Sequence, residues 1–235
     1  MPPSARQHLT IYGARQRASV TLTGAAVFAA LAALLTLAKA EVPFPLIPYL
    51  KIDFSEIPIM TGFFLFGPLA GGTSAVIQWL FLNFQGSDAP LGPALKFAAI
   101  ISTLGGFWFG NVLYQHLRGS RPHPILALSS ILASGTVWRV ATMTLVNYAV
   151  LVYIAPVFFG ADYLGYARFT LEKSTGWQFA NDFSVLLYTL LFTGVYNIVN
   201  LLVGTVPAGL IVSPIATTFK HITSLEAWIS RSIKS

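Results

Sequence analysis

Long apolar runs constrain this chain more than any other feature of its sequence. Residues 20–40 are almost all apolar or small, and comparably long runs recur at 94–117, 125–154 and 183–212. At a rise of about 1.5 Å per residue, about twenty such residues cross the roughly 30 Å hydrocarbon core of a bilayer. Only 9% of the residues are charged and 55% are hydrophobic, which excludes a soluble globular domain. The predicted fold class is an all-α integral membrane protein.

Two shorter apolar segments, separated by Gly67-Pro68, complete a predicted bundle of six transmembrane helices in the plasma membrane. Lys and Arg concentrate in the terminal tails and around Arg118 and Arg121, so the positive-inside rule predicts cytoplasmic termini. We expect one membrane domain over residues 1–235. Its predicted parts are a cytoplasmic tail at 1–19, transmembrane helices at 20–40, 55–67, 68–84, 94–117, 125–154 and 183–212, external segments at 41–54 and 155–182, and a cytoplasmic tail at 213–235.

A charged run lies between apolar segments in PYLKIDFSEIPIMTGFFLFGPLAGG, residues 48–72. Its charges are Lys51, Asp53 and Glu56. Ionisable groups so close to apolar spans are costly unless they reach headgroups, water or a bound polar ligand, which makes this stretch a candidate site. A surface loop whose charges mark the membrane boundary is the simpler alternative. The prolines that precede the run favour an extended segment.

Polar residues in the later helices supply further candidate ligand contacts. Lys96, Asn147, Asn197 and Asn200 are expected to face outward, and asparagines combine donors and acceptors that suit a neutral heterocycle held among apolar and aromatic walls. Asn197 and Asn200 are spaced i, i+3 and share a helix face, although either can instead form a buried interhelical hydrogen bond. Arg139 lies deeper, where we expect it to pair with backbone carbonyls or to face a water-filled cytoplasmic crevice.

Catalysis and nucleic-acid binding find no support in the sequence. All four histidines fall in predicted cytoplasmic tails or loops without metal-ligand spacing, and no P-loop is present. The chain has no cysteine, and its basic residues are scattered at segment ends rather than gathered in a stripe. We therefore expect no enzymatic activity, no metal, no cofactor and no nucleic-acid partner.

Small residues recur at helical spacing in two places. Ala25, Ala29 and Ala33 form a stripe along the first helix, which favours close approach of another helix in lipid. That helix can belong to a partner subunit or to this bundle. Close helix contacts are also expected at three glycines of the fourth span, Gly105, Gly106 and Gly110.

The charged stretch closely resembles the riboflavin-specific S component of energy-coupling-factor (ECF) transporters, whose first loop and following helices read like LKIDFSDIP followed by GPLAG. Further similarity lies in TMTLVNYAVLVYIAPVF (142–158) and YNIVNLLVG (196–204). The resemblance implies a six-helix subunit that captures riboflavin at the outer face. Delivery across the membrane then depends on a transmembrane coupling subunit and ABC-type ATPase subunits, and riboflavin is the transported substrate rather than a cofactor.

The same resemblance implies roles for individual residues. Loop one covers the ligand, which places Leu50, Lys51 and Asp53 in the substrate-binding set. The outer parts of helices four to six hold the flavin, so Asn147 and Asn197 become the candidates for hydrogen bonds to the isoalloxazine. Lys96 stands where the family often has Asn, and Asn200 stands where it usually has Lys; both are kept in the set. The alanine stripe at Ala25, Ala29 and Ala33 matches the surface that docks on the coupling subunit. An S component for another vitamin or heterocycle and a non-transporting membrane scaffold are the alternatives.

Overall fold

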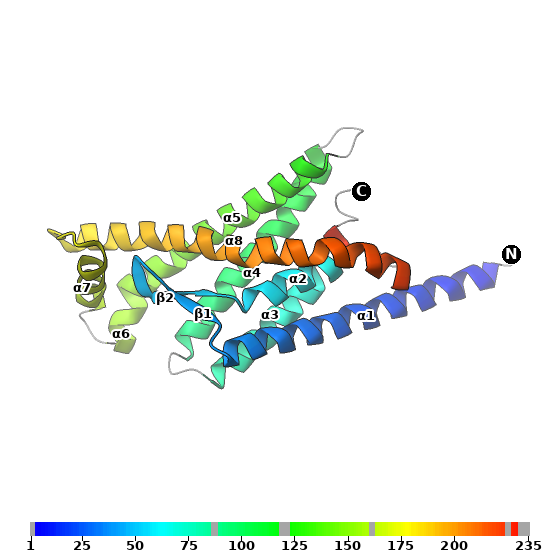
Figure 1. Ribbon diagram of the computed structural model, residues 1–235, viewed down its shortest axis with the longest axis horizontal. Coiled ribbons are helices and arrows are strands. Elements are labelled where there is room, and N and C mark those ends of the chain that lie inside the picture. Colours follow the sequence, from blue (N-terminus) through cyan, green and yellow to red (C-terminus); the bar gives the residue numbers. More distant parts are fainter. Residues whose placement is uncertain (1–2, 86–88, 118–122, 160–162, 224–226, 230–235) are drawn as a thin grey trace.

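Helices make up most of the structure, with one short β-hairpin after the first helix (Figure 1). The computed structural model describes residues 3–85, 89–117, 123–159, 163–223 and 227–229. The predicted inner loop at 118–122 lies outside the described residues. In chain order the elements are α1 (Pro3–Leu37), β1 (Glu41–Phe44), β2 (Ile47–Asp53), α2 (Glu56–Phe66), α3 (Pro68–Asn83), α4 (Leu91–Leu117), α5 (Pro124–Ala149), the π-helical turn η1 (Val150–Ile154), α6 (Ala155–Phe159), α7 (Tyr163–Thr175) and α8 (Asp182–Thr223).

Within the described residues, four helical stretches are long and apolar enough to cross a membrane. They are Ala18–Leu37, Leu91–Leu117, Ile125–Val157 and Asp182–Ala216. The chain is therefore a mostly helical membrane protein, in agreement with the class that its composition indicates. In Figure 1 the hairpin, α6 and α7 gather at one end of these helices, whereas α1 begins and α8 ends toward the other.

The short helix α2 lies at the centre of the bundle. Ile59, Met60 and Phe63 are completely buried, and α2 packs against α1, α3 and α8. A helix that is apolar on all sides is stable only when it is enclosed on all sides, which explains this position. Gly67 ends α2 with φ +96°, a conformation that favours glycine, and Pro68 begins α3. The break indicated by Gly67-Pro68 therefore separates two helices.

Several elements extend beyond the bounds expected from the sequence. α1 begins at Pro3, inside the predicted tail 1–19, and α8 continues to Thr223, past the expected end at residue 212. Pro207 and Pro214 lie inside α8. A long membrane helix can tolerate proline where neighbouring groups satisfy the freed carbonyls. The segment predicted as external at 155–182 contains α6 and α7.

The hairpin β1–β2 covers one end of the helices. Its strands are antiparallel, with Glu41 opposite Asp53 and an irregularity between Pro43 and Phe44. Phe44 and Ile47 are buried against α7 and α8, in a cluster that also contains Ala167, Leu171, Phe179 and Val185. This apolar anchor, together with the extended backbone that prolines favour, accounts for strands in a segment otherwise expected to be a loop.

Helices α4 and α5 approach closely through glycines. A Cβ atom on Gly106 would lie 2.7 Å from the Cα of Gly135, and one on Gly110 would lie 2.5 Å from the carbonyl oxygen of Ser130. These contacts confirm the close packing expected at Gly106 and Gly110. A Cβ on Gly105 would meet nothing nearer than 3.9 Å, so that glycine is not required for the contact.

The alanine stripe of α1 packs inside the protein. Ala25 and Ala29 are each 1% exposed, and Ser74 of α3 donates a hydrogen bond of 2.9 Å to the carbonyl oxygen of Ala25. Ala33 is half-buried. The expectation that Ala25 and Ala29 form a docking face is therefore wrong, because the chain's own helices cover them. Small residues allow close approach to any helix, so their spacing alone does not distinguish a partner from a neighbour.

Candidate ligand-binding site

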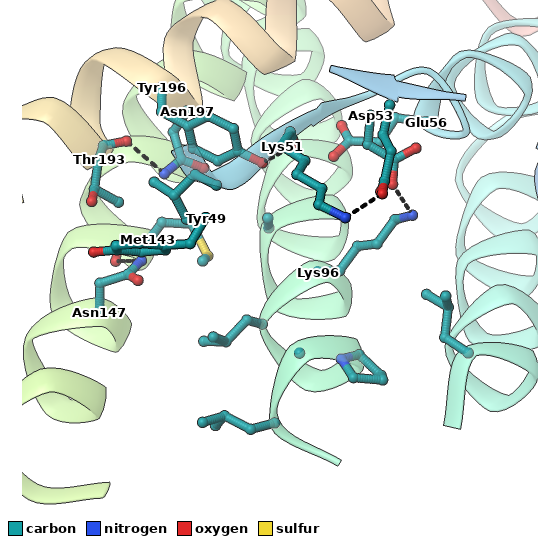
Figure 2. Close-up of a pocket in the computed structure, with 18 of the residues that line it drawn as sticks. Tyr49, Lys51, Asp53, Glu56, Lys96, Met143, Asn147, Thr193, Tyr196 and Asn197 are labelled. Carbon is teal, nitrogen blue, oxygen red and sulfur yellow. Dashed lines mark hydrogen bonds and ion pairs between the residues drawn. The ribbon is translucent and has the colours of Figure 1, made fainter. Parts of the chain in front are cut away.

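A cavity of about 450 Å³ lies beneath the hairpin (Figure 2). This volume is in the range of pockets that enclose small organic ligands. Its walls come from the hairpin, the end of α1, and α2, α3, α4, α5, η1, α7 and α8. Figure 2 shows Asn147 and Asn197 on one side of the cavity and Asp53 and Lys96 on the other. The residues named in the figure are Tyr49, Lys51, Asp53, Glu56, Lys96, Met143, Asn147, Thr193, Tyr196 and Asn197.

The hairpin is held over the cavity by hydrogen bonds to its main chain. Tyr196 of α8 donates a hydrogen bond of 2.8 Å to the carbonyl oxygen of Lys51. Ser174 of α7 donates one of 2.7 Å to the carbonyl oxygen of Leu46. The main-chain N–H of Asp53 donates one of 2.9 Å to the side-chain oxygen of Asn200. Three separate contacts therefore attach the hairpin to α7 and α8.

Two of the lysines that line the cavity, Lys51 and Lys96, are paired with carboxylates. Lys51 forms an ion pair with Glu41, and Lys96 forms one with Asp53. Lys96 also donates to the hydroxyl of Ser55, 2.8 Å away. The Lys96–Asp53 pair is mostly shielded, with each side chain 17% exposed, whereas Lys51 is 50% exposed. Because opposite charges are matched within hydrogen-bonding distance, this part of the wall offers little net charge to a ligand.

A third ion pair, which is fully buried, lies at the centre of a hydrogen-bond network that joins four helices, α2, α4, α5 and α8. Arg139 of α5 donates to both carboxylate oxygens of Glu56 on α2, at 2.7 and 2.9 Å, and both side chains line the cavity. Arg139 also donates to Thr103 at 3.2 Å and to Asn197 at 3.1 Å. The expectation that Arg139 pairs with backbone carbonyls or a water-filled crevice was wrong. Glu56 is its partner because a carboxylate accepts both arms of a planar guanidinium.

The three candidate asparagines lie in different surroundings. Asn147 and Asn197 line the cavity, and each donates a hydrogen bond to the carbonyl one helical turn earlier, at Met143 and Thr193. Asn200 is not among the lining residues. It donates to Glu56 at 2.8 Å and accepts from the hairpin, so both ends of its amide are used within the protein. Asn200 therefore has the buried, hydrogen-bonded role that the sequence left open as an alternative to ligand binding.

Six of the seven residues expected to bind substrate therefore meet at one cavity: Leu50, Lys51, Asp53, Lys96, Asn147 and Asn197. Sequence reasoning did not include the tyrosines of the wall, Tyr49, Tyr166 and Tyr196. Aromatic walls were expected in general, but the chain has nine tyrosines and no local pattern separates these three. It also missed Glu56 and Arg139 as partners, although two opposite charges within apolar spans are a signal that each needs the other.

Comparisons with known proteins agree with a membrane-embedded binding subunit. The family described as "ECF transporter, substrate-specific component" matches residues 20–209. Two relatives are the riboflavin transporter RibU of Staphylococcus aureus (strain TCH60), 32% identical over 53% of this chain, and the riboflavin transporter FmnP of Bacillus subtilis (strain 168), 34% identical over 46% of it. The matched regions span 61% and 55% of those two proteins.

A solved structure of the S component of a bacterial ECF transporter has the same fold. The TM-score is 0.62 at 22% sequence identity, over 86% of this chain and 98% of that one. Fold and site together define a helical membrane protein with a cavity of polar and apolar side chains under a hairpin. The chain belongs to the family of ECF transporter substrate-specific components. It is accordingly a multi-pass membrane protein and, as a substrate-specific component, a transport subunit rather than an enzyme.

Proposed function

We propose that this S component captures riboflavin in the cavity beneath the hairpin. The observation that carries the proposal is the composition of the cavity wall, where Asn147 and Asn197 retain hydrogen-bonding capacity beside tyrosine and aliphatic side chains. A flavin ring system needs hydrogen bonds at its polar edge and flat apolar contacts over its faces. The names of the two relatives, both riboflavin transporters, support the same ligand.

Riboflavin binding can be tested directly on purified protein. Protein purified in mild detergent from cells grown with the vitamin should retain flavin absorbance, and stripped protein should quench riboflavin fluorescence with one site per chain. Asn147→Ala and Asn197→Ala should each weaken binding by about 10-fold or more, since each leaves a polar ligand group unpaired.

Asn83→Ala is the matched control for these variants. Asn83 makes the same hydrogen bond to the carbonyl one turn earlier, 2.8 Å from Trp79, but it does not line the cavity. Its replacement should leave riboflavin affinity unchanged. Folded wild-type protein that binds no flavin would refute riboflavin as the ligand. A screen of other vitamins then separates an S component of different specificity from a scaffold that binds none.

A different heterocycle is the second candidate, and the Lys96–Asp53 pair is the observation that favours it. This lysine is committed to Asp53 and Ser55, and Asn200 is committed to Glu56 and the hairpin, so neither is available to the ligand in this arrangement. The polar edge of the ligand would then meet mainly Asn147 and Asn197. Comparing riboflavin with other neutral vitamins in the same quenching or calorimetric titration ranks the two candidates.

The proposed topology has six spans, an outward-facing cavity and cytoplasmic termini. The chain has no cysteine, so single cysteines can report which side each end of a helix occupies. Val42 of the hairpin is 51% exposed, and Leu117 at the end of α4 is 72% exposed. A membrane-impermeant maleimide should label Val42→Cys in intact cells and Leu117→Cys only after permeabilisation. The reverse pattern would overturn the orientation.

Uptake is proposed to require a transmembrane coupling subunit and ABC-type ATPase subunits. Apart from family membership, the support is the missing P-loop, which leaves the chain without the usual means of using ATP. Proteoliposomes containing this chain alone should bind riboflavin without accumulating it. Addition of the other subunits with internal or external ATP should produce uptake, and accumulation by the chain alone would contradict the proposal.

A further inference from the structure

The orientation of the Asn197 amide is set by two partners of opposite character. Arg139 Nε donates to Asn197 Oδ1 at 3.1 Å, and a guanidinium has no acceptor. Asn197 Nδ2 donates to the carbonyl oxygen of Thr193 at 2.9 Å, and a carbonyl has no donor. Neither contact survives exchange of the amide oxygen and nitrogen. The two partners therefore fix the positions of the oxygen and the nitrogen of the Asn197 amide.

This orientation determines what Asn197 offers to the cavity. Its oxygen is directed to the guanidinium, and one of its two N–H groups is used by Thr193. The remaining N–H of Asn197, a cavity-lining residue, is a donor. Asn147 differs, because its Nδ2 donates to the Met143 carbonyl at 2.7 Å while its Oδ1 has no partner within the part of the chain that the structure describes. Asn147 therefore presents an acceptor together with its second N–H.

Arg139 is itself held in place on several sides. Glu56 accepts from both of its terminal nitrogens and Thr103 from one of them, and the Arg139 side chain is 1% exposed. Asn200 donates to the same carboxylate of Glu56 at 2.8 Å, which fixes the position of the acid. A guanidinium bound in this way has little freedom to rotate, so its Nε–H points at Asn197 whether or not a ligand is present.

We propose that the Glu56–Arg139 ion pair is a positioning element that fixes Asn197 as a hydrogen-bond donor, so that the cavity selects a ligand with an acceptor at that point. The ligand class is a neutral heterocycle whose polar edge carries a carbonyl oxygen or ring nitrogen for Asn197 and a ring N–H for the Asn147 oxygen. Arg139 acts through Asn197 and is a positioning residue. This inference deepens the proposed function and rests on it for the identity of the ligand.

The first part of the test needs no ligand. Thermal unfolding in detergent is measured for Arg139→Lys, Asn197→Ala and the double variant. Lysine keeps the charge opposite Glu56 but has no Nε–H fork to reach the amide as well. The two Tm shifts should be non-additive if Arg139 holds Asn197, because the second change removes a contact already lost. Additive shifts would overturn the positioning contact, whatever the ligand is.

The second part measures selectivity. Dissociation constants are determined for riboflavin and for its two ring-thiocarbonyl analogues, in which sulfur replaces an oxygen acceptor. Wild type should prefer riboflavin over at least one analogue by about 10-fold, the value of one good hydrogen bond. In Arg139→Lys this preference should fall to about 2-fold or less. An unchanged preference would overturn the selective role of the ion pair, since a purely structural role alters both affinities equally.

A second variant protects the test against a folding failure. Glu56→Leu combined with Arg139→Met removes both charges together, and such replacements of buried ion pairs are often tolerated. It should also lose the preference for riboflavin, whereas Asn83→Ala should keep it. Wild type that binds none of the flavins would refute the proposed function instead, and the Tm measurements would then decide whether Arg139 orients Asn197.

Discussion

Burial, rather than the ion-pair contact itself, should determine what each ion pair contributes to stability. Arg139 and Glu56 are joined at 2.7 Å with 1% and 2% of their side chains exposed. Arg168 and Asp182 are joined at the same 2.7 Å with 33% and 74% exposed. Both are arginine–carboxylate pairs with the same shortest nitrogen–oxygen distance, although Glu56 accepts from two guanidinium nitrogens and Asp182 from one. Replacing one acid at a time therefore compares a buried pair with an exposed one.

Glu56→Gln should destabilise the protein strongly. It leaves the Arg139 charge buried without a counter-charge, which costs about 3–5 kcal/mol. At about 2–4 °C per kcal/mol for a chain of this size, Tm should fall by at least about 6 °C. Asp182→Asn, the matched change in the exposed pair, should cost less than about 1 kcal/mol, because water solvates the arginine left behind.

The assay is thermal unfolding of both variants in the same detergent, followed by intrinsic fluorescence. Glu56→Leu with Arg139→Met should recover much of the loss, since no buried charge remains. Equal, small Tm shifts for Glu56→Gln and Asp182→Asn would refute the reasoning. That result would mean that water reaches Arg139 as readily as it reaches the exposed pair.

Three further predictions test other parts of the structure. Gly106→Ala should lower the free energy of unfolding by roughly 1–3 kcal/mol, because its Cβ would meet the α5 backbone at 2.7 Å. Its control, Gly105→Ala, should change the free energy of unfolding by no more than about 0.5 kcal/mol. Equal Tm values for the two variants would contradict the close packing at Gly106. Tyr196→Phe removes the hydrogen bond to the Lys51 carbonyl and should speed hydrogen exchange in β2 by about 5-fold; unchanged exchange would count against the attachment. Lys96→Met leaves the shielded carboxylate of Asp53 without its cation and should lower Tm by about 2 °C or more; an unchanged Tm would argue against the pair.

The sequence predicted features that depend on local pattern. Apolar runs of sufficient length indicate membrane helices whatever their neighbours are, and Gly67-Pro68 carries both signals for the end of one helix and the start of another. Lys51 and Asp53 of the hairpin were identified because charges are costly beside apolar spans. These arguments need no knowledge of which helices are neighbours in space.

Features that depend on neighbours were not predictable in the same way. Asn197 and Asn200 share a helix face, yet one lines the cavity and the other lies against Glu56 and the hairpin. Glu56 and Arg139 are 83 positions apart, so no local spacing pairs them. The alanine stripe failed for the same reason, because close approach by α3 and by a partner subunit make identical demands on side-chain size.

The attachment of the hairpin has a consequence for how substrate preference can change during evolution. Ser174, Tyr196 and Asn200 all contact main-chain atoms of the hairpin, at Leu46, Lys51 and Asp53. Main-chain atoms are the same for every residue type except the N–H of proline. Mutations that alter the hairpin's own side chains facing the cavity therefore leave these hydrogen bonds in place. The side chains of the hairpin can therefore change so that a different ligand is preferred, while the rest of the protein stays unchanged.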